Sequence, residues 1–287
     1  MNDDLVIFIF SHGRPDNFHT IKTLEKHGYT GAVKVIIDNE DKTAARYYEL
    51  FGDKVIMFDK SEAAKLFDVG DNFSDRRAIV YARNMAYKIA ADLGYKYFLQ
   101  FEDDYTDFRY KINARGEYLH KRDIKDLDVV LSCLLDYYKS TPAKVVSMQQ
   151  GGDFLGGEDS TNVISANRSR NVMRKVMNSL LCSVSRPVEW VGRMNDDVNT
   201  YISAGRRGDL FLSTSMLALQ QPVTQKVSGG HSDIYKSMGT YVKSFISVMY
   251  APSCVSVQMM NSRHPRIHHQ VAYNNAVPCI VSEKWRK

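Results

Sequence analysis

Three consecutive carboxylates, Glu102-Asp103-Asp104, directly follow an apolar, aromatic-rich run at residues 97–101. Like charges this close together repel one another unless they reach water or share a cation. Carboxylate oxygens are the ligands that Mg²⁺ and Mn²⁺ prefer, and either ion can bridge protein carboxylates to a phosphate. We therefore interpret these three residues as a metal site, with a solvated acidic loop as the alternative.

A second acidic pair, Asp196-Asp197, lies in the segment WVGRMNDD, just before residues 198–202, which we predict to be helical. Aspartate is an ordinary residue at the start of a helix, where its carboxylate caps free backbone N–H groups. A transfer reaction to a hydroxyl group also needs a general base that accepts the hydroxyl proton. Both interpretations of this pair are open at this point.

The elements that position these acids alternate between short apolar runs and segments with helical spacing. The apolar runs predict buried parallel strands, and Gly28, Gly52 and Gly94 mark the ends of the helices. The predicted strands are residues 5–10, 32–37, 54–58 and 97–101, and the predicted helices are residues 18–27, 43–51 and 77–93. This alternation predicts an α/β, Rossmann-like fold with a mostly parallel central sheet flanked by helices.

Polar residues follow three of the predicted strands. Ser11-His12-Gly13-Arg14 follows the first strand, Asp38-Asn39 the second, and the three acids the fourth. In an open parallel sheet, ligands bind beyond the carboxyl ends of the strands, so these groups should converge at one edge. Taken singly, His12 and Arg14 could cap a helix, Asp38 could be a turn residue, and Arg83 on the third helix could form a surface salt bridge.

The second half of the chain has shorter strands and more turns. A helix is predicted at residues 124–139 and a strand at 144–148, with further short strands around 172–184 and 209–219. The glycine-rich segment 151–157 lacks the lysine of a phosphate loop and the GxGxxG spacing, so it is either a flexible surface loop or a loop that faces substrate. No repeat or linker divides the chain, and we expect one compact domain.

The composition is that of a soluble globular protein. No apolar run approaches the roughly 18 residues of a membrane span, and the acidic N-terminus lacks the basic region of a signal peptide, so a cytoplasmic protein is expected. The four cysteines form no CxxC pair, which favours buried, reduced thiols over disulfides or zinc.

Positive charge gathers in the second half, within an overall net charge of +5. Each basic cluster alone would be an ordinary solvated face, but three of them favour an acidic partner. The clusters are Arg168, Arg170, Arg174 and Lys175; Arg206 and Arg207; and Arg263, Arg266, Lys284, Arg286 and Lys287.

The layout as a whole resembles the GT-A glycosyltransferases. In that family a DxD motif at the end of the fourth strand binds a divalent metal, and a later ED-type pair at a helix start supplies the catalytic base. Glu102-Asp103-Asp104 matches the first motif as ExD, and Asn195-Asp196-Asp197 matches the second with Asp196 in place of glutamate. The family often adds a metal-binding histidine near its end, for which the candidates are His264, His268, His269 and His231.

More narrowly, the stretches IFIFSHGRPDN, IIDNE, and YARNMAY before FEDD are similar to phage TET-associated glycosyltransferases and related hydroxymethylcytosine sugar transferases. The resemblance implies a UDP-sugar donor, Mn²⁺ or Mg²⁺, and an acceptor hydroxyl on 5-hydroxymethylcytosine in double-stranded phage DNA. It also implies a nucleotide-sugar-binding half at residues 1–110 and an acceptor-binding, catalytic half at 111–287.

Residue roles follow from the same resemblance. Asp104 would hold the metal, helped by Glu102 and by His264 or His268. The donor would be bound by His12, Arg14, Asp38, Arg83 and Asp103. Asp197 would be the catalytic base, with Asp196 beside it.

Three other interpretations compete with this one. The acceptor could instead be a saccharide, a lipid or a protein. A two-metal nuclease built from both aspartate pairs would cleave DNA without any nucleotide-sugar. A non-catalytic DNA-binding module would need no carboxylate cluster.

Phe154, Trp190 and Tyr201 could either stack on a base or belong to the core.

Overall fold

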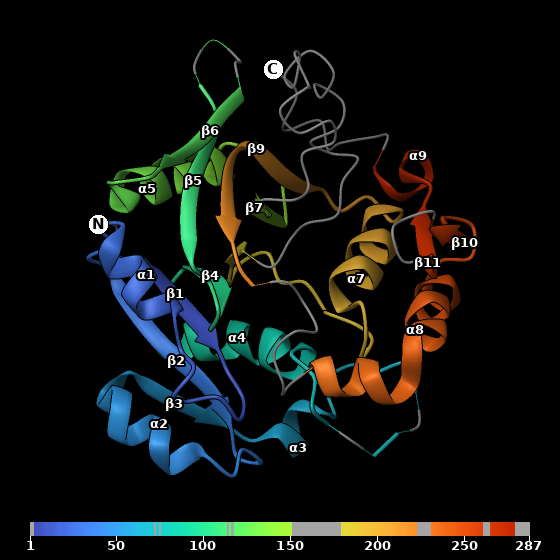
Figure 1. Cartoon of the computed structure of the whole chain (residues 1–287), viewed down its shortest axis with the longest axis horizontal. Coiled ribbons are helices and arrows are strands. Elements are labelled where there is room, and N and C mark those ends of the chain that lie inside the picture. Colours follow the sequence, from blue (N-terminus) through green and yellow to red (C-terminus); the bar gives the residue numbers. More distant parts are fainter. Residues whose placement is uncertain are drawn as a thin grey trace.

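The central feature of the molecule is one large mixed sheet (Figure 1). The computed structural model describes residues 3–71, 73–74, 76–113, 115, 118–150, 179–222, 231–260 and 265–278. Within these ranges the sheet has nine strands in the order β3-β2-β1-β4-β8-β7-β9-β5-β6. Their bounds are β1 (Leu5–Phe10), β2 (Ala32–Asp38), β3 (Val55–Phe58), β4 (Tyr97–Glu102), β5 (Asp107–Ile112), β6 (Tyr118–Asp123), β7 (Val145–Gln150), β8 (Leu180–Ser183) and β9 (Phe211–Gln220).

The strand directions confirm the prediction of a mostly parallel sheet. β1 pairs in parallel with β2 and β4, and β2 pairs in parallel with β3. β8 and β5 run against their neighbours, whereas β7 and β9 are parallel to each other. Every residue of β1 is buried, as expected for a central strand covered on both faces. The carboxyl ends of β1, β2 and β4 therefore lie at the same edge of the sheet.

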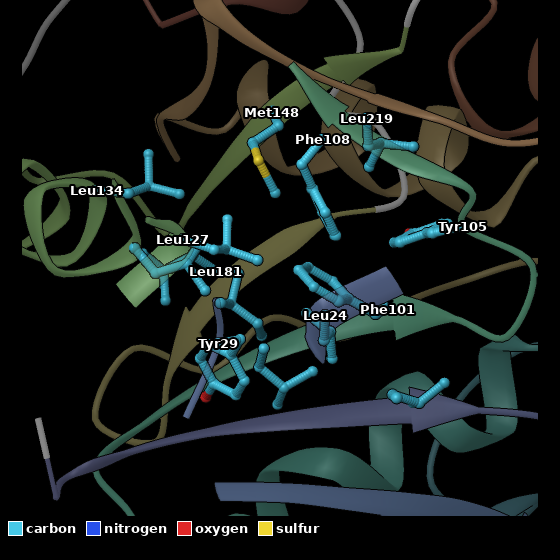
Figure 2. Close-up of a cluster of buried hydrophobic side chains, with 14 of the residues drawn as sticks. Leu24, Tyr29, Phe101, Tyr105, Phe108, Leu127, Leu134, Met148, Leu181 and Leu219 are labelled. Atoms are coloured by element: carbon cyan, nitrogen blue, oxygen red, sulfur yellow. The ribbon is translucent and has the colours of Figure 1, made fainter. Parts of the chain in front are cut away.

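Helices cover both faces of this sheet. One face carries the buried cluster that contains Leu24, Tyr47 and Leu131, from α1, α2 and α5; Figure 2 shows part of it around Phe101 and Phe108. The other face carries residues of α4 and α7. The helices are α1 (Thr20–Lys26), α2 (Ala44–Phe51), α3 (Lys60–Ala63), α4 (Val80–Asp92), α5 (Leu127–Lys139), α7 (Asp196–Gly205), α8 (His231–Tyr250) and α9 (Tyr273–Ala276), with a 3-10 turn at Gly52–Lys54.

Trp190 and Tyr201 belong to the second of these clusters, with 0% and 2% of their surface exposed. The core interpretation is therefore correct for both, and neither side chain is placed to stack on an external base. Phe154 and the glycine-rich segment 151–157 lie outside the described residues.

The predicted elements of the first half match the observed ones to within about three residues, but the predictions missed several later elements. The β5–β6 hairpin was missed because β5 alternates polar and apolar residues and β6 is mostly polar, so neither strand forms an apolar run. A two-stranded ribbon, β10 (Val255–Met260) with β11 (Arg266–Val271), was also missed, because polar residues interrupt the apolar ones in both strands. α5 begins at Leu127, later than predicted, because the Asp126 side chain accepts a hydrogen bond from Val129 N and caps the helix there.

Three of the four cysteines lie within the described residues. Cys182 and Cys254 are buried free thiols, as expected, but Cys133 is exposed because it lies on the outer side of α5. Cys279 lies outside the described ranges.

Among the described helices, none combines the length and the apolar character that a bilayer crossing requires.

Glycine substitutions test how closely the turn after α1 packs against the backbone at Lys125. Gly28 has φ +76°, and a Cβ added there would lie 2.7 Å from Lys125 O, whereas Gly94 has φ +82° with open space around it. We expect Gly94→Ala to lower the free energy of unfolding by about 1 kcal/mol, the cost of a left-handed alanine. Gly28→Ala should cost about 1–3 kcal/mol more because of the backbone clash. Urea unfolding of both variants measures this, and equal losses would contradict the predicted difference.

Candidate active site

The loop that carries the three acids is fixed against the start of α1. The backbone carbonyl of Asp103 accepts hydrogen bonds from His19 N at 2.8 Å and Thr20 N at 3.1 Å. The Thr20 hydroxyl donates to Glu102 O at 2.5 Å and accepts from Tyr105 N at 3.0 Å. These bonds satisfy free N–H groups at the helix start and also set the direction in which each carboxylate leaves the strand.

Asp103 is fully buried and joins the ends of β1 and β4. Its Oδ1 accepts a hydrogen bond from Arg14 Nη2 at 2.6 Å, and its Oδ2 accepts a short one from the Ser11 hydroxyl. Burial raises the pKa of Asp103, although the charge of Arg14 and the bond from Ser11 oppose that effect. Both oxygens of this carboxylate are therefore already engaged by protein groups.

Asp104 has a different environment, although it is the next residue. Its Oδ1 is buried without a hydrogen-bond partner. Burial, and next the charge of Asp103, raise the pKa of Asp104 to about 6. A buried carboxylate oxygen without a partner is costly, and a bound cation would satisfy it. Of the three acids, Asp104 has the oxygen best suited to a metal.

The described residues contain no preformed cage for that metal. In these ranges, no three His, Cys, Asp or Glu side chains come together in an arrangement that would hold an ion. Mg²⁺ typically takes one or two protein carboxylates and completes its shell with water and substrate phosphates. The residues present fit a site of that kind, in which the substrate supplies ligands.

Asp38, at the end of β2, is held by a histidine and a lysine. Its Oδ2 lies 2.8 Å from His12 Nδ1 and 3.0 Å from Lys60 Nζ, and its Oδ1 accepts from Glu40 N at 3.1 Å. Burial by itself would raise the pKa of Asp38, but the bond from His12 and the charge of Lys60 together lower it. The sequence correctly predicted that His12 and Asp38 lie at the same edge of the sheet. It did not indicate Lys60, because lysine is seldom buried and the position of Lys60 in the sequence matches no motif.

Arg83 connects the two acidic clusters. Its side chain, only 4% exposed, leaves α4 with Nη2 3.7 Å from Glu102 Oε1 and Nε 2.9 Å from Asp196 Oδ2. The guanidinium carbon lies 5.2 Å from the centre of the Trp190 ring. One buried cation therefore stands between the end of β4 and the start of α7.

The turn before α7 has a constrained backbone. Asn195 has a left-handed conformation, φ 52° and ψ 35°, and its Nδ2 donates to Lys243 O at 2.6 Å. Three residues earlier, Gly192 has φ +87°, and a Cβ there would lie 2.3 Å from Asn199 Nδ2. This geometry aims Asp196 inward and leaves Asp197 partly exposed.

The two aspartates of the pair consequently differ in charge environment. Burial raises the pKa of Asp196 to about 7, with the charge of Arg83 opposing the shift and those of Asp197 and Glu102 adding to it. Because Asp197 is the more exposed of the two, it is the carboxylate that an external substrate can reach. Asp196 is instead buried against Arg83.

Two of the four candidate metal-binding histidines, His268 and His269, have side chains within the described residues. His269 Nδ1 lies 3.5 Å from Asn195 Nδ2, so β11 meets the turn that precedes Asp196. His268 Nδ1 lies 2.7 Å from the backbone carbonyl of His269. His264, the His231 side chain and the basic cluster around Arg170 lie outside the described residues. Arg206 and Arg207 are exposed just after α7.

The solved structures of similar shape include several complexes of one enzyme of Mycobacterium tuberculosis. Glucosyl-3-phosphoglycerate synthase in complex with Mn²⁺, UDP and phosphoglyceric acid matches with TM-score 0.47 and 10% identity, covering 93% of this chain and 86% of that one. Its complex with Mg²⁺ and UDP gives 0.46, 10%, 93% and 87%, and its complex with UDP alone gives 0.46, 8%, 94% and 90%. At these scores the likeness transfers no residue role and no ligand to this chain.

Sequence comparison is more direct. No curated protein matches the sequence. The profile of one family, the TET-associated glycosyltransferases, matches residues 5–230, which is well over half of the chain and includes both acidic clusters. The chain therefore belongs to the TET-associated glycosyltransferase family and is a glycosyltransferase, as its motifs indicated.

Proposed function

We propose that this protein transfers a sugar from a UDP-sugar to the hydroxyl of 5-hydroxymethylcytosine in double-stranded DNA, with Mn²⁺ or Mg²⁺ bound. The observation that carries the proposal is the meeting of the Glu102-Asp103-Asp104 and Asp196-Asp197 clusters at Arg83. Family membership supports glycosyl transfer, and the net charge of +5 agrees with a nucleic-acid acceptor.

The donor belongs at the ends of β1, β2 and β4. The nucleoside would lie near His12 and Asp38, while Arg14, anchored on Asp103, would face the diphosphate. Arg83 is buried between Glu102 and Asp196, so we assign it to holding these carboxylates in place, where the family resemblance had suggested a contact with the donor.

Asp104, with Glu102 beside it, would hold the metal. When bound, the ion would neutralise charge that develops on the departing diphosphate, a stabilisation that commonly amounts to several kcal/mol. The chain's own contribution is to keep one unpartnered carboxylate oxygen ready at that position.

The acceptor side depends on Asp197. The hydroxyl oxygen forms a bond to the anomeric carbon while the bond from that carbon to the diphosphate oxygen breaks, and Asp197 accepts the hydroxyl proton. UDP leaves with the bonding electron pair. Asp196 stays buried against Arg83 and positions the start of α7.

The nuclease alternative is disfavoured by the same geometry. Two-metal hydrolysis needs two ions about 3.5–4 Å apart between the carboxylate clusters. Here the buried guanidinium of Arg83 lies between Glu102 and Asp196, where one of those ions would have to lie. The division into a donor half at 1–110 and an acceptor half at 111–287, and a location in the host cytoplasm, are further parts of the proposal.

Matched substitutions separate the two acidic sites. Asp104→Asn should weaken UDP-sugar binding by at least about tenfold in Mn²⁺ and abolish metal-dependent transfer, because the ligand oxygen loses its charge. Asp197→Asn should lower turnover by about 10²–10⁴-fold while leaving donor affinity within about twofold, because only proton acceptance is lost. Calorimetry with UDP and transfer to hydroxymethylated DNA measure both effects. Equal loss of donor affinity in the two variants would show that the sites are wrongly assigned.

Because Asp196 is buried with a raised pKa, we expect the free energy of unfolding to depend on pH. Its pKa is about 7 in the folded protein against an ordinary 3.8, so between these values the folded state keeps a proton that the unfolded chain has released. This carboxyl therefore lowers the free energy of unfolding as pH rises through that window. Relative to Asp196→Asn, the wild type should lose at most about 1.4 kcal/mol per pH unit there. Urea titrations at several pH values test this, and a constant difference would refute it.

A further inference from the structure

A long segment near the end of the chain carries no negative side chain. Residues 234–282 contain no aspartate or glutamate, although these acids make up 33 of the 287 residues, and the segment includes Lys236, Lys243, Arg263 and Arg266. Its described parts form most of α8, all of β10 and β11, and α9. A surface built from such a segment offers no local repulsion to a polyanion.

The β10–β11 ribbon presents a polar face from this segment. In its antiparallel register Ser256 pairs with Gln270, Gln258 with His268, and Met260 with Arg266. Successive strand residues point to opposite faces, so these six positions share one face. Five of them are exposed, namely Ser256, Gln258, Met260, Arg266 and Gln270. The face combines amide, hydroxyl and guanidinium groups.

The opposite face of the ribbon packs on α8. Val255 is buried, Val271 packs against the same core, and the Ser244 hydroxyl of α8 donates to Ile267 O at 3.0 Å. At the base, Ala272 N donates to Cys254 O at 2.7 Å. The polar face is therefore held outward by a packed helix.

This ribbon is attached to the acceptor side of the site. Asn195, directly before Asp196, donates to Lys243 O of α8 and lies against His269 of β11. Figure 1 shows β10 and β11 at one edge of the molecule beside α7 and α8, while α2 lies at the opposite lower edge. His269 lies on the ribbon face that packs on α8, so the ribbon borders the turn before Asp196 while its exposed face points away from α8.

We propose that the exposed face of the β10–β11 ribbon enters the major groove of duplex DNA beside the target base and reads the neighbouring base pairs. This inference rests on the proposed function. The major groove, about 12 Å wide, admits a two-stranded ribbon, and glutamine and arginine pair there with adenine and guanine. The C5 substituent of a pyrimidine projects into the same groove, so the ribbon and the acceptor hydroxyl share one side of the duplex.

The test compares Arg266→Ala and the double variant Gln258→Ala, Gln270→Ala with wild type. Arg46→Ala is the matched control, because Arg46 is an exposed arginine of α2 whose partners are Asp16 and Glu49. Duplexes carry one 5-hydroxymethylcytosine with randomised flanking pairs. The measurements are transfer to each duplex, transfer to the free 5-hydroxymethyl-deoxycytidine nucleoside, and duplex affinity by fluorescence anisotropy at two salt concentrations.

Both ribbon variants should lose about 5- to 100-fold in kcat/KM on duplexes and show a flatter preference for flanking bases, as expected when a base contact is removed. Transfer to the nucleoside should stay within about twofold, and Arg46→Ala should behave as wild type throughout. Unchanged duplex kcat/KM and unchanged flanking preference would overturn the ribbon's role. An equal loss on the nucleoside would also overturn it, since the ribbon would then support the chemistry or the fold instead.

Failure of the proposed function gives a different result. If wild type turns over UDP-sugar but transfers nothing to hydroxymethylated DNA, the proposed acceptor is wrong. Duplex affinity then tests whether the ribbon contacts DNA. Weaker and less salt-dependent duplex binding by Arg266→Ala would support that contact, and binding with wild-type affinity would overturn it.

Discussion

A buried guanidinium between carboxylates from two distant segments is the interaction on which this site depends. Arg83 reaches Glu102 at the end of β4 and Asp196 at the start of α7, with Trp190 stacked nearby. Removing one partner of a buried ion pair costs about 3–5 kcal/mol, because the remaining charge is left without compensation. The sheet edge and α7 are therefore held in a fixed relation. Since each carries one acidic cluster, this ion pair also sets the distance across which donor and acceptor would meet.

Within that frame, neighbouring carboxylates of the same type have different environments. Asp103 is satisfied by Ser11 and Arg14, whereas the adjacent Asp104 keeps one buried oxygen without a partner. Asp196 is buried with its pKa raised to about 7, whereas Asp197 is partly exposed. Roles in catalysis follow from such contrasts, because environments that separate the properties of paired acids also separate their tasks. In each pair one aspartate is buried against an arginine and the other is more exposed.

The second half of the chain adds a different kind of surface. α8 and the β10–β11 ribbon come from a segment without acidic residues, and Asn195 fastens them to the turn before Asp196. A glycosyltransferase that acts on a polymer must hold the polymer as well as the reacting group. The fold packs α8 beneath the ribbon and leaves the polar face of the ribbon exposed.

The sequence alone determined the strands β1 to β4, the edge at which His12, Asp38 and the acids of β4 converge, and the family. Apolar runs that alternate with helices permit few arrangements, so the strand ends were predictable. The contacts of the folded chain were needed to show that Lys60 pairs with Asp38, that Arg83 bridges the acidic clusters, that Asp103 and Asp104 differ, and that His269 reaches Asn195. The physical reason is that a polar side chain takes its partner and its burial from segments far away in the chain, which no local pattern records.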